Sequence, residues 1–373
     1  MPLSAVDPAN YQALLDEKVA TVSAILTPFD MPEPGVFPSA TTGYRLRAEF
    51  RMWHEGEALD YVMYRRDDPK TPVPINEFPI AHLAIQGLML PLRECLKQSD
   101  ELRRKLFQVE FLATLSGDMV VTLAYHRKLD TPWEAAAEDL ITALAAQCPK
   151  LSVVGRSRKQ KVVMGKDYVQ ESLTIEGRPF SYQQVEQSFT QPNGQINTQM
   201  IEWACAQAAH CTGDLLELYC GNGNFTLPLS CHFDKVIATE LSKTAVRAAR
   251  NNLLENTIEN VHILRMSAEE VSQAIRGDRV FRRVAELPQP LSDYSLSTVF
   301  VDPPRAGLDD YTVNMVSDFD NILYVSCNPE TLADNLQTLR KTHRVTQFAL
   351  FDQFPYTHHM ECGLLLQRDA SHA

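Results

Sequence analysis

Three side chains that could carry chemistry follow apolar segments in the C-terminal half of the chain. Asp302 and Cys327 each come directly after an apolar run typical of a buried strand, and Glu361 lies in the loop before the last such run. In an open α/β sheet, ligands collect beyond the carboxyl ends of the strands. A thiolate can add to an electrophilic carbon, and a carboxylate can remove a proton. The spacing therefore predicts one site that holds a nucleophile, Cys327, and a general base, Glu361.

Cys327 lies in the sequence Ser326-Cys327-Asn328-Pro329, which indicates a strand end, an Asn cap and a proline in the first turn of a helix. A thiol beside a helix N-terminus gains thiolate character, so we expect a reactive cysteine. The alternative is a small buried residue, which is the usual role of a cysteine in a protein core.

Asp302 lies in the sequence Asp-Pro-Pro-Arg, where two prolines fix an extended backbone and remove two hydrogen-bond donors. The loop can then point the carboxylate into the crevice, with Arg305 close behind. A plain proline-rich turn capped by aspartate is the alternative, but it does not explain why the motif follows a buried strand.

A metal site is not expected. His358, His359, Glu361 and Cys362 are close in sequence, but adjacent side chains point apart and no second pair of ligands follows at zinc spacing. The eight cysteines form no Cys-x-x-Cys pair, so neither a disulfide framework nor an iron–sulfur cluster is predicted.

The apolar run Asp214–Leu218 leads into a turn with Gly221 and Gly223, which predicts the first strand, turn and helix of a doubly wound sheet. Glu240 ends the next apolar run, 19 residues after Gly221, where an acid can accept hydrogen bonds from ribose hydroxyls. Thr226 replaces the third glycine of the dinucleotide fingerprint, so an adenosyl ligand such as S-adenosylmethionine fits better than NAD.

A chain of 373 residues is longer than one compact core usually holds, so two domains are expected, 1–190 and 191–373. The first is predicted to be α+β with an antiparallel sheet, including a strand at 44–53, its hairpin partner at 59–64, and a hairpin over 106–125. The second alternates strands and helices in the α/β manner, and we expect seven strands in its sheet.

Basic residues gather in the N-terminal half, where they could contact RNA phosphates. Between Lys150 and Lys166 there are six basic residues and no acid, a strip that could follow a phosphate backbone or could equally be a solvated hairpin tip. Phe107 and His126 lie beside further basic residues, and an aromatic ring there could stack on an unpaired base. Phe107 could instead be a core residue.

The net charge of −12 argues against indiscriminate binding to nucleic acid, so an RNA partner would be gripped locally. No apolar run approaches the ~20 residues of a membrane span, and the N-terminus lacks a secretory signal pattern. We therefore expect a cytoplasmic protein, and a monomer.

Four segments together closely resemble the RNA uracil-5 methyltransferase family: Glu217–Phe225, Phe300–Leu308, Tyr324–Leu332 and Asp352–Cys362. The likeness covers nearly the whole chain. It implies a class I, Rossmann-like domain dependent on S-adenosylmethionine, preceded by an RNA-binding domain. Within the family, the chain is similar to the members that methylate the T-loop uridine of tRNA to 5-methyluridine, or ribothymidine. The ribosomal-RNA members typically carry a TRAM barrel and a four-cysteine motif, and this sequence shows neither.

The resemblance also implies roles for individual residues. Cys327 would add to uracil C6, C5 would accept the methyl group, and Glu361 would remove the C5 proton before Cys327 is eliminated. The matched positions that would hold the cofactor are Gln191, Tyr219, Gly221, Asn224, Glu240 and Asp302. The candidates for RNA contact are Arg51, Phe107, His126 and Arg305. T-loop-like RNAs such as tmRNA would be further substrates.

Of four alternatives, two are compatible with these features and two are not. A ribosomal-RNA uracil-5 methyltransferase would use the same chemistry, and an RNA-binding or RNA-folding module could keep the cofactor fold without turnover. An RNA cytosine-5 methyltransferase would need a cysteine at the Asp302 loop, and a folate- and flavin-dependent enzyme would need an N-terminal dinucleotide fingerprint. The sequence has neither of these last two features.

Overall fold

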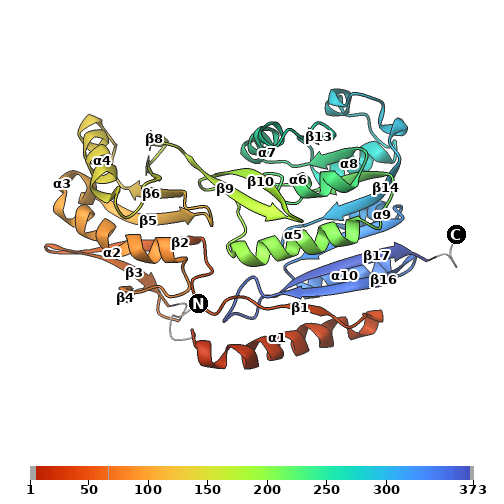
Figure 1. Cartoon of the computed structure of the whole chain (residues 1–373), viewed down its shortest axis with the longest axis horizontal. Coiled ribbons are helices and arrows are strands. Elements are labelled where there is room, and N and C mark those ends of the chain that lie inside the picture. The colour runs from red at the N-terminus through yellow and green to blue at the C-terminus, as the bar shows by residue number, and fades with distance from the viewer. Residues whose placement is uncertain (1–5, 66, 370–373) are drawn as a thin grey trace. The chain divides into compact units, whose positions relative to one another are not determined.

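The computed structural model describes residues 6–65 and 67–369, and the chain divides into two compact units (Figure 1). Unit 1 contains Ala40–Ser172 and Gln184–Gly194. Unit 2 contains Ala9–Ser39, Leu173–Gln183 and the chain from Gln195 onwards. The division drawn from the sequence at residue 190 gives the N-terminal domain two segments, Ala9–Ser39 and Leu173–Gln183, that the contacts assign to unit 2.

Unit 2 is built on an eight-stranded sheet with the order β1-β16-β17-β15-β14-β11-β12-β13. Its strands are β1 (Gly35–Phe37), β11 (Asp214–Leu218), β12 (Val236–Thr239), β13 (Val261–Leu264), β14 (Leu296–Val301), β15 (Asn321–Ser326), β16 (His343–Phe351) and β17 (Glu361–Arg368). All pairings are parallel except those of β17, which runs antiparallel between β15 and β16. The sequence predicted seven strands, and the eighth is β1, which pairs with β16 although more than 300 residues separate them.

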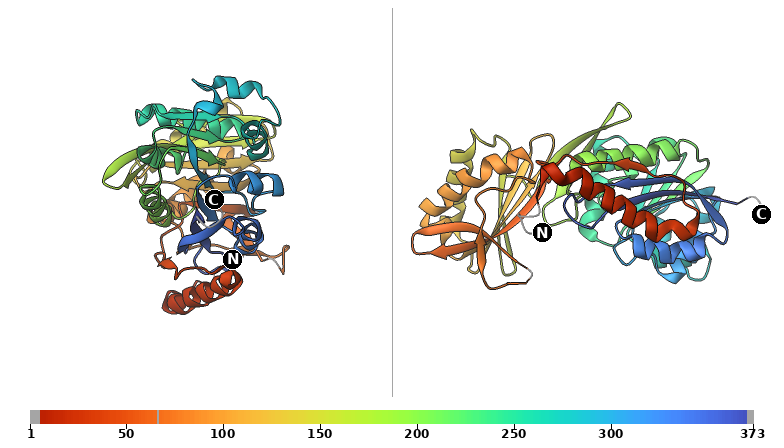
Figure 2. Two further views of the ribbon diagram at one scale, coloured as in Figure 1. Left: turned by 90° about the vertical axis from the view of Figure 1, so that its right-hand side faces the viewer. Right: turned by 90° about the horizontal axis from the view of Figure 1, so that it is seen from below.

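The helices of unit 2 are α1 (Tyr11–Leu26), α5 (Gly194–Ala208, whose first residue falls in unit 1), α6 (Thr226–Leu229), α7 (Lys243–Glu255), α8 (Ala268–Ile275), α9 (Asp310–Val316) and α10 (Pro329–Leu339). Side-chain caps fix several of their starts. Ser242 caps α7, and Ser267 forms a reciprocal capping box with Glu270 at α8. α1 packs against α10, and the red N-terminal helix lies beside the blue elements of the C-terminal part of the chain (Figure 2). The predicted polar insertion at 277–294 contains only the 3₁₀ turns Arg282–Glu286 and Leu291–Asp293.

Unit 1 is α+β, with a seven-stranded sheet in the order β4-β3-β2-β5-β6-β7-β8. Its strands are β2 (Arg47–Glu55), β3 (Ala58–Tyr64), β4 (Pro72–Pro74), β5 (Leu106–Ala113), β6 (Met119–Tyr125), β7 (Leu151–Ser157) and β8 (Gln160–Met164), and its helices are α2 (Leu83–Gln98), α3 (Asp100–Arg103) and α4 (Thr131–Leu144). The two predicted hairpins are present as β2–β3 and β5–β6. One pair departs from the antiparallel pattern: β6 and β7 are parallel, because α4 returns the chain between them.

A two-stranded ribbon of β9 (Tyr168–Ile175) and β10 (Arg178–Val185) completes the fold. The sequence pattern predicts a strand at 182–189, which overlaps only the end of β10, and it gives no prediction for β9. The alternation of buried and exposed residues along β9 is hard to recognise in the sequence, because one of its buried residues is the charged Glu171. The Glu171 carboxylate accepts hydrogen bonds from the backbone N–H groups of Leu115 (2.7 Å) and Ser116 (3.2 Å). No helix among the described residues is long and apolar enough to span a membrane.

Candidate active site

The register of the unit 2 sheet brings the predicted functional residues to one edge. Leu218 pairs with Thr239 and with Val301, so the residues that follow these three, Tyr219, Glu240 and Asp302, leave the sheet side by side. Ser326 pairs with Cys362 in the antiparallel pair β15–β17. Continuing that register by one position sets Cys327 opposite Glu361.

The turn after β11 has backbone angles that few residues adopt. Tyr219 has φ of +63°, Gly221 +57° and Gly223 +89°. A Cβ on Gly223 would lie 2.7 Å from Cδ1 of Leu227, whereas a Cβ on Gly221 would meet no described residue within 4 Å. Glycine at 223 therefore permits close helix packing, and the backbone of Gly221 faces open space. Tyr219 has no such freedom and holds a strained conformation at the site.

Polar side chains of neighbouring elements fix this turn. Glu240 accepts hydrogen bonds from the backbone N–H of Gly221 (3.1 Å) and of Ser242 (2.6 Å). Asn252, fully buried in α7, donates to the carbonyl oxygen of Asn222 (2.9 Å). Asn224 exchanges two side-chain hydrogen bonds with Asn197 of α5 (2.8 and 2.9 Å).

Asn197 and Asn252 were not singled out from the sequence. An asparagine within a helix carries no distinguishing local signal, and only the fold reveals which backbone groups it contacts.

The loop that begins at Asp302 is tied to α10. The backbone carbonyl of Arg305 accepts hydrogen bonds from Asn328 (3.1 Å) and from the Thr331 hydroxyl (3.2 Å). Asn335 bonds both backbone groups of Leu308, each at 2.9 Å, and accepts from the Tyr324 hydroxyl at 2.8 Å. The loops that carry Asp302 and Cys327 are therefore one hydrogen-bonded assembly.

The thiol of Cys327 is less acidic than its position suggested. Asn328 caps α10 as predicted, accepting from the N–H of Glu330 (3.1 Å). Burial, together with the negative charges of Glu361 and Asp302, nevertheless raises the pKa of Cys327 to about 11, and Arg305 only partly opposes this. Desolvation and the two carboxylates thus shift the pKa of this thiol in the direction opposite to the one expected from the helix N-terminus.

Both carboxyl groups beside the thiol have raised pKa values. Burial raises the pKa of Asp302 to about 7. Burial and the charge of Asp302 raise the pKa of Glu361 to about 8, while Arg305 and Lys18 lower it. Glu361 was predicted in a loop, but it is the first residue of β17 and is buried. A carboxyl group whose pKa lies near neutrality is well matched to proton transfer.

The remaining predicted residues are Arg305, in the loop after Asp302, and four residues of unit 1. Arg305 is exposed, and its charge acts on both Cys327 and Glu361. Gln191 belongs to unit 1, in the segment before α5. Arg51, Phe107 and His126 also belong to unit 1.

In unit 1, Phe107 and His126 stack with ring centroids 3.9 Å apart and an interplanar angle of 11°. The guanidinium carbon of Arg51 lies 5.4 Å from the centroid of the Phe107 ring. Phe107 is half-buried and His126 exposed, so Phe107 is not a core residue. Both line a cavity of about 750 Å³ whose other lining residues include Arg127, Lys128, Arg156 and Arg158. The structure thus brings three of the four RNA candidates into one cluster.

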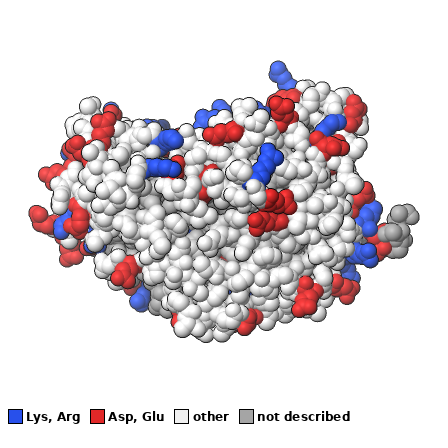
Figure 3. All heavy atoms as spheres, viewed as in Figure 1, with Lys and Arg blue, Asp and Glu red and all other residues white. Residues whose placement is uncertain are grey.

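Three of the six basic residues in the strip from Lys150 to Lys166 pair with acids from other segments. Arg156 forms an ion pair with the buried Glu186, and Lys161 bonds both Glu186 (2.9 Å) and Asp167 (2.7 Å). Lys150 lies 3.6 Å from Asp118. On the face seen in Figure 3, cations and carboxylates are interspersed. The strip therefore offers fewer available charges than its sequence suggested.

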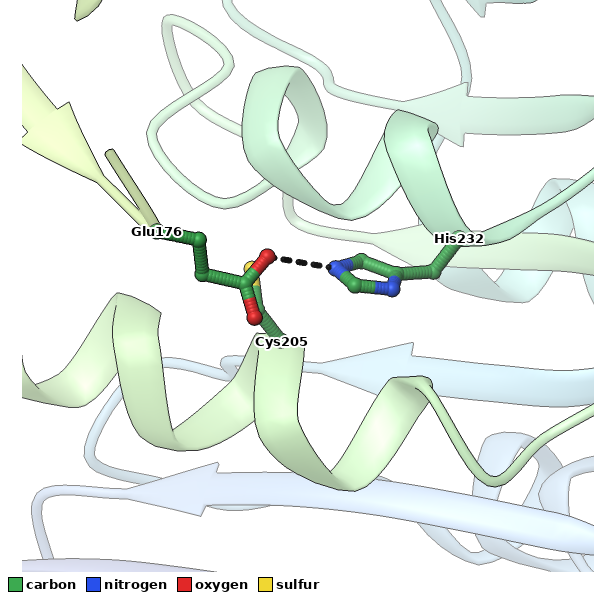
Figure 4. A group of neighbouring side chains, drawn as sticks. All are labelled: Glu176, Cys205 and His232. Carbon is green, nitrogen blue, oxygen red and sulfur yellow. Dashed lines mark hydrogen bonds and ion pairs between the residues drawn. The ribbon is translucent and has the colours of Figure 1, made fainter. Parts of the chain in front are cut away.

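A second cluster of possible ligand atoms is formed by Glu176, Cys205 and His232, all within 4.8 Å of one another (Figure 4). Glu176 comes from the turn between β9 and β10, and its carboxylate lies 3.1 Å from Nε2 of His232. Cys205 is fully buried in the apolar core beneath them, and burial raises the pKa of its thiol. The cluster shares no residue with the strand-end site.

Known proteins resemble this chain in fold and in sequence. The fold of the chain resembles the crystal structure of Pyrococcus abyssi tRNA (uracil-54, C5)-methyltransferase in complex with S-adenosyl-L-homocysteine, with a TM-score of 0.71 and 21% identity over 96% of this chain and 83% of that one. The fold is thus that of a Rossmann-like methyltransferase. The model of the tRNA (Uracil-5-)-methyltransferase family matches residues 10–369.

Proteins of similar sequence indicate the same family. The chain is 54% identical to the tRNA/tmRNA (uracil-C(5))-methyltransferase of Aromatoleum aromaticum, over 99% of this chain and 98% of the relative. It is 51% identical to the Vibrio parahaemolyticus protein of the same name, over 98% and 99%. The chain belongs to the tRNA (uracil-5-)-methyltransferase family.

The charges around Cys327 predict how fast its thiol is alkylated. At pH 9, Glu361 is mostly ionised and opposes the thiolate, so Glu361→Gln is expected to raise the rate of iodoacetamide labelling of Cys327 by about fivefold. Arg305→Gln removes the opposing cation and slows the same reaction. Labelling is followed by peptide mass spectrometry, with the exposed Cys231 as an internal control that does not change. Equal rates at Cys327 in all three proteins would contradict the charge arrangement.

Proposed function

We propose that this protein transfers a methyl group from S-adenosylmethionine to C5 of the T-loop uridine of tRNA, forming 5-methyluridine. The observation that carries the proposal is the register of β15 and β17, which sets a thiol and a buried carboxyl group opposite each other at the edge of a methyltransferase sheet. The family membership of the whole chain supports the same reaction.

The residues at the strand ends fit this cofactor. The Glu240 carboxylate uses one lone pair on each oxygen for backbone N–H groups and keeps others to accept ribose hydroxyls. Gly221 leaves open space against its backbone, and Tyr219, Asn224 and Asp302 flank it. When bound, S-adenosylmethionine supplies an electrophilic methyl group on a positively charged sulfur. Gln191 is proposed as a further contact on the basis of the family motif.

Cys327 is proposed as the nucleophile and Glu361 as the general base. The Cys327 thiolate forms a bond to C6 of uracil, and the electrons of the C5–C6 double bond move toward the C4 oxygen. Carbon C5, now nucleophilic, would take the methyl group as the bond from that methyl group to the sulfonium sulfur breaks and leaves a neutral thioether. Glu361 removes the proton from C5, the double bond re-forms, and the bond from sulfur to C6 breaks. Arg305 supplies the cation that favours both the thiolate and the charge developing on the ring.

The RNA is proposed to contact unit 1 through Arg51, Phe107 and His126. The stacked rings of Phe107 and His126 offer an aromatic surface to an unpaired base, and Arg51 can bind phosphate or stack. Extruding a uridine from its folded loop costs a few kcal/mol, and such contacts offset that cost. The relatives' names include tmRNA, which we propose as a second substrate of this chain.

An RNA-folding module without turnover is the competing function. It would not need a carboxyl group buried opposite a thiol, an arrangement that is costly unless it is used. A ribosomal-RNA methyltransferase would share the chemistry but not the substrate, and mapping of the modified base separates the two.

Replacing the nucleophile separates catalysis from RNA binding. With undermodified tRNA and labelled S-adenosylmethionine, the wild-type protein is expected to label one T-loop uridine. Cys327→Ala is expected to lower transfer by at least about a thousandfold, because the barrier to direct methylation of uracil remains, while leaving tRNA affinity within about threefold. Cys231→Ala is the matched control and retains activity. Transfer by Cys327→Ala at the wild-type rate would refute the covalent route.

Phe107→Ala tests the RNA surface of unit 1. Loss of one stacking contact worth about 1–3 kcal/mol is expected to weaken tRNA binding by about tenfold or more, with the affinity for S-adenosylhomocysteine unchanged. Binding is measured by filter retention at fixed salt. Tyr64→Ala removes an exposed aromatic ring of the same sheet outside the cluster and serves as the control. Equal tRNA affinity in both variants would exclude Phe107 from the RNA contact.

A further inference from the structure

One charged residue lies in the buried stripe of α1. The buried residues of this helix follow one another at helical spacing: Tyr11, Leu15, Lys18, Val22 and Leu26. Lys18 is only 8% exposed. Burying an ammonium ion is costly unless it is paired, and an apolar side chain would serve packing better at this position. Packing alone therefore does not explain why a lysine occupies this position.

The ammonium group of Lys18 is held at the end of β16. It forms an ion pair with Asp352 and lies 3.2 Å from the carbonyl oxygen of Phe354. The other carboxylate oxygen of Asp352 accepts from the Tyr11 hydroxyl (2.8 Å), which itself accepts from the N–H of Ser39 (2.7 Å). The N–H of Asp352 donates to the carbonyl of Phe37 (3.0 Å). The N-terminal helix and β1 thus clamp the start of the segment that leads to Glu361.

The charge of Lys18 also reaches Glu361. The titratable groups that act on or with Glu361 are Asp302 and Arg305 from the loop after β14, Cys327 at the end of β15, Cys362 next to it in β17, and Lys18 from α1. Asp302 disfavours the ionised carboxylate, and the two cations favour it. Arg305 is exposed and screened by solvent, whereas Lys18 is buried and screened much less.

We propose that Lys18 is a positioning residue for the general base, fixing the segment from Asp352 to Glu361 and stabilising the ionised carboxylate of Glu361. This inference rests on the proposed role of Glu361. The Lys18 ammonium group bonds Asp352 and the carbonyl of Phe354, so its direct contacts hold the segment that leads to Glu361, and its effect on the Glu361 carboxylate is electrostatic.

The test compares Lys18→Arg, Lys18→Met and the double variant Lys18→Met/Asp352→Asn. The double variant removes both buried charges, so it does not leave Asp352 as an unpaired anion and is expected to fold. Two quantities are measured: the pH profile of kcat for methyl transfer, and the titration of the Glu361 side chain by carbon-13 NMR of glutamate-labelled protein. The resonance is assigned by its absence in Glu361→Gln.

Loss of the cation is expected to move the titration of Glu361, and the rising limb of the kcat profile, upward by about one pH unit in Lys18→Met, and in the same direction by less in the double variant, which also loses the Asp352 anion. The rate at pH 7 then falls by up to about tenfold and recovers by about pH 9 to 10. Lys18→Arg keeps the charge and is expected to keep both curves near those of the wild type. A double variant with wild-type curves would overturn the proposal and leave Lys18 with a packing role only.

The two readouts separate this inference from the proposed function. If the NMR titration shifts and the kcat profile does not, Lys18 stabilises the carboxylate as proposed, and Glu361 is not the general base. If neither wild-type transfer nor its Glu361 dependence is detected, the proposed reaction fails independently of the NMR result. If Lys18→Met alone is unstable, the double variant and Lys18→Arg still decide between the outcomes.

Discussion

The antiparallel insertion of β17 between β15 and β16 is the constraint on which the site depends. Parallel strands of a doubly wound sheet deliver their carboxyl ends to one edge, and β17 delivers its amino end there. Only this reversal allows the first residue of a strand, Glu361, to meet Cys327 at the end of its neighbour. A side chain placed by two strand pairings is held more rigidly than one in a free loop, and rigid placement is what proton transfer requires.

Burial sets the chemistry of this edge. Desolvation is the largest cause of the raised pKa values of Asp302, Glu361 and Cys327, and it is reinforced by the repulsion among them. Without a compensating cation, the site therefore resists ionisation. A positively charged sulfonium group at the strand ends would relieve this resistance, so cofactor binding and activation of the thiol would be linked. Arg305 from the exposed side and Lys18 from the buried side supply the protein's own positive charge.

Much of this architecture follows from the sequence, for identifiable physical reasons. Strand β11 was predicted with its observed bounds, and the apolar run before Cys327 was predicted to be the strand that is β15, because both are short apolar runs that end in turn signals. The cofactor turn and the Asp302 and Cys327 loops follow from Gly, Pro and Asn at positions with specific backbone demands. The sequence could not reveal partners that are distant along the chain. The pairing of β1 with β16 and the contact of Lys18 with Asp352 each join residues more than 300 positions apart.

In two places the local sequence pattern gave the wrong picture of the electrostatics. The helix N-terminus beside Cys327 suggested a lowered thiol pKa, because the two opposing carboxylates come from other strands and are invisible locally. The basic strip from Lys150 to Lys166 looked uncompensated, because Asp118, Asp167 and Glu186 reach it only in the folded chain. In both cases the sequence could not show which charged residues approach each other in the folded chain. Lys18 is different, because it interrupts an apolar stripe at helical spacing, and that pattern by itself indicates a buried charge.

In the proposed reaction, the sulfur of Cys327 bonds to C6 of a uracil whose C5 proton is then removed by Glu361. A T-arm RNA carrying 5-fluorouridine at the target position tests this most directly, since the fluorine replaces the departing proton and the reaction stops after methyl transfer. Peptide mass spectrometry is expected to find a methylated fluorouridine covalently attached to the peptide that contains Cys327, in the presence of S-adenosylmethionine. Attachment to another cysteine, or turnover without any adduct, would contradict the account.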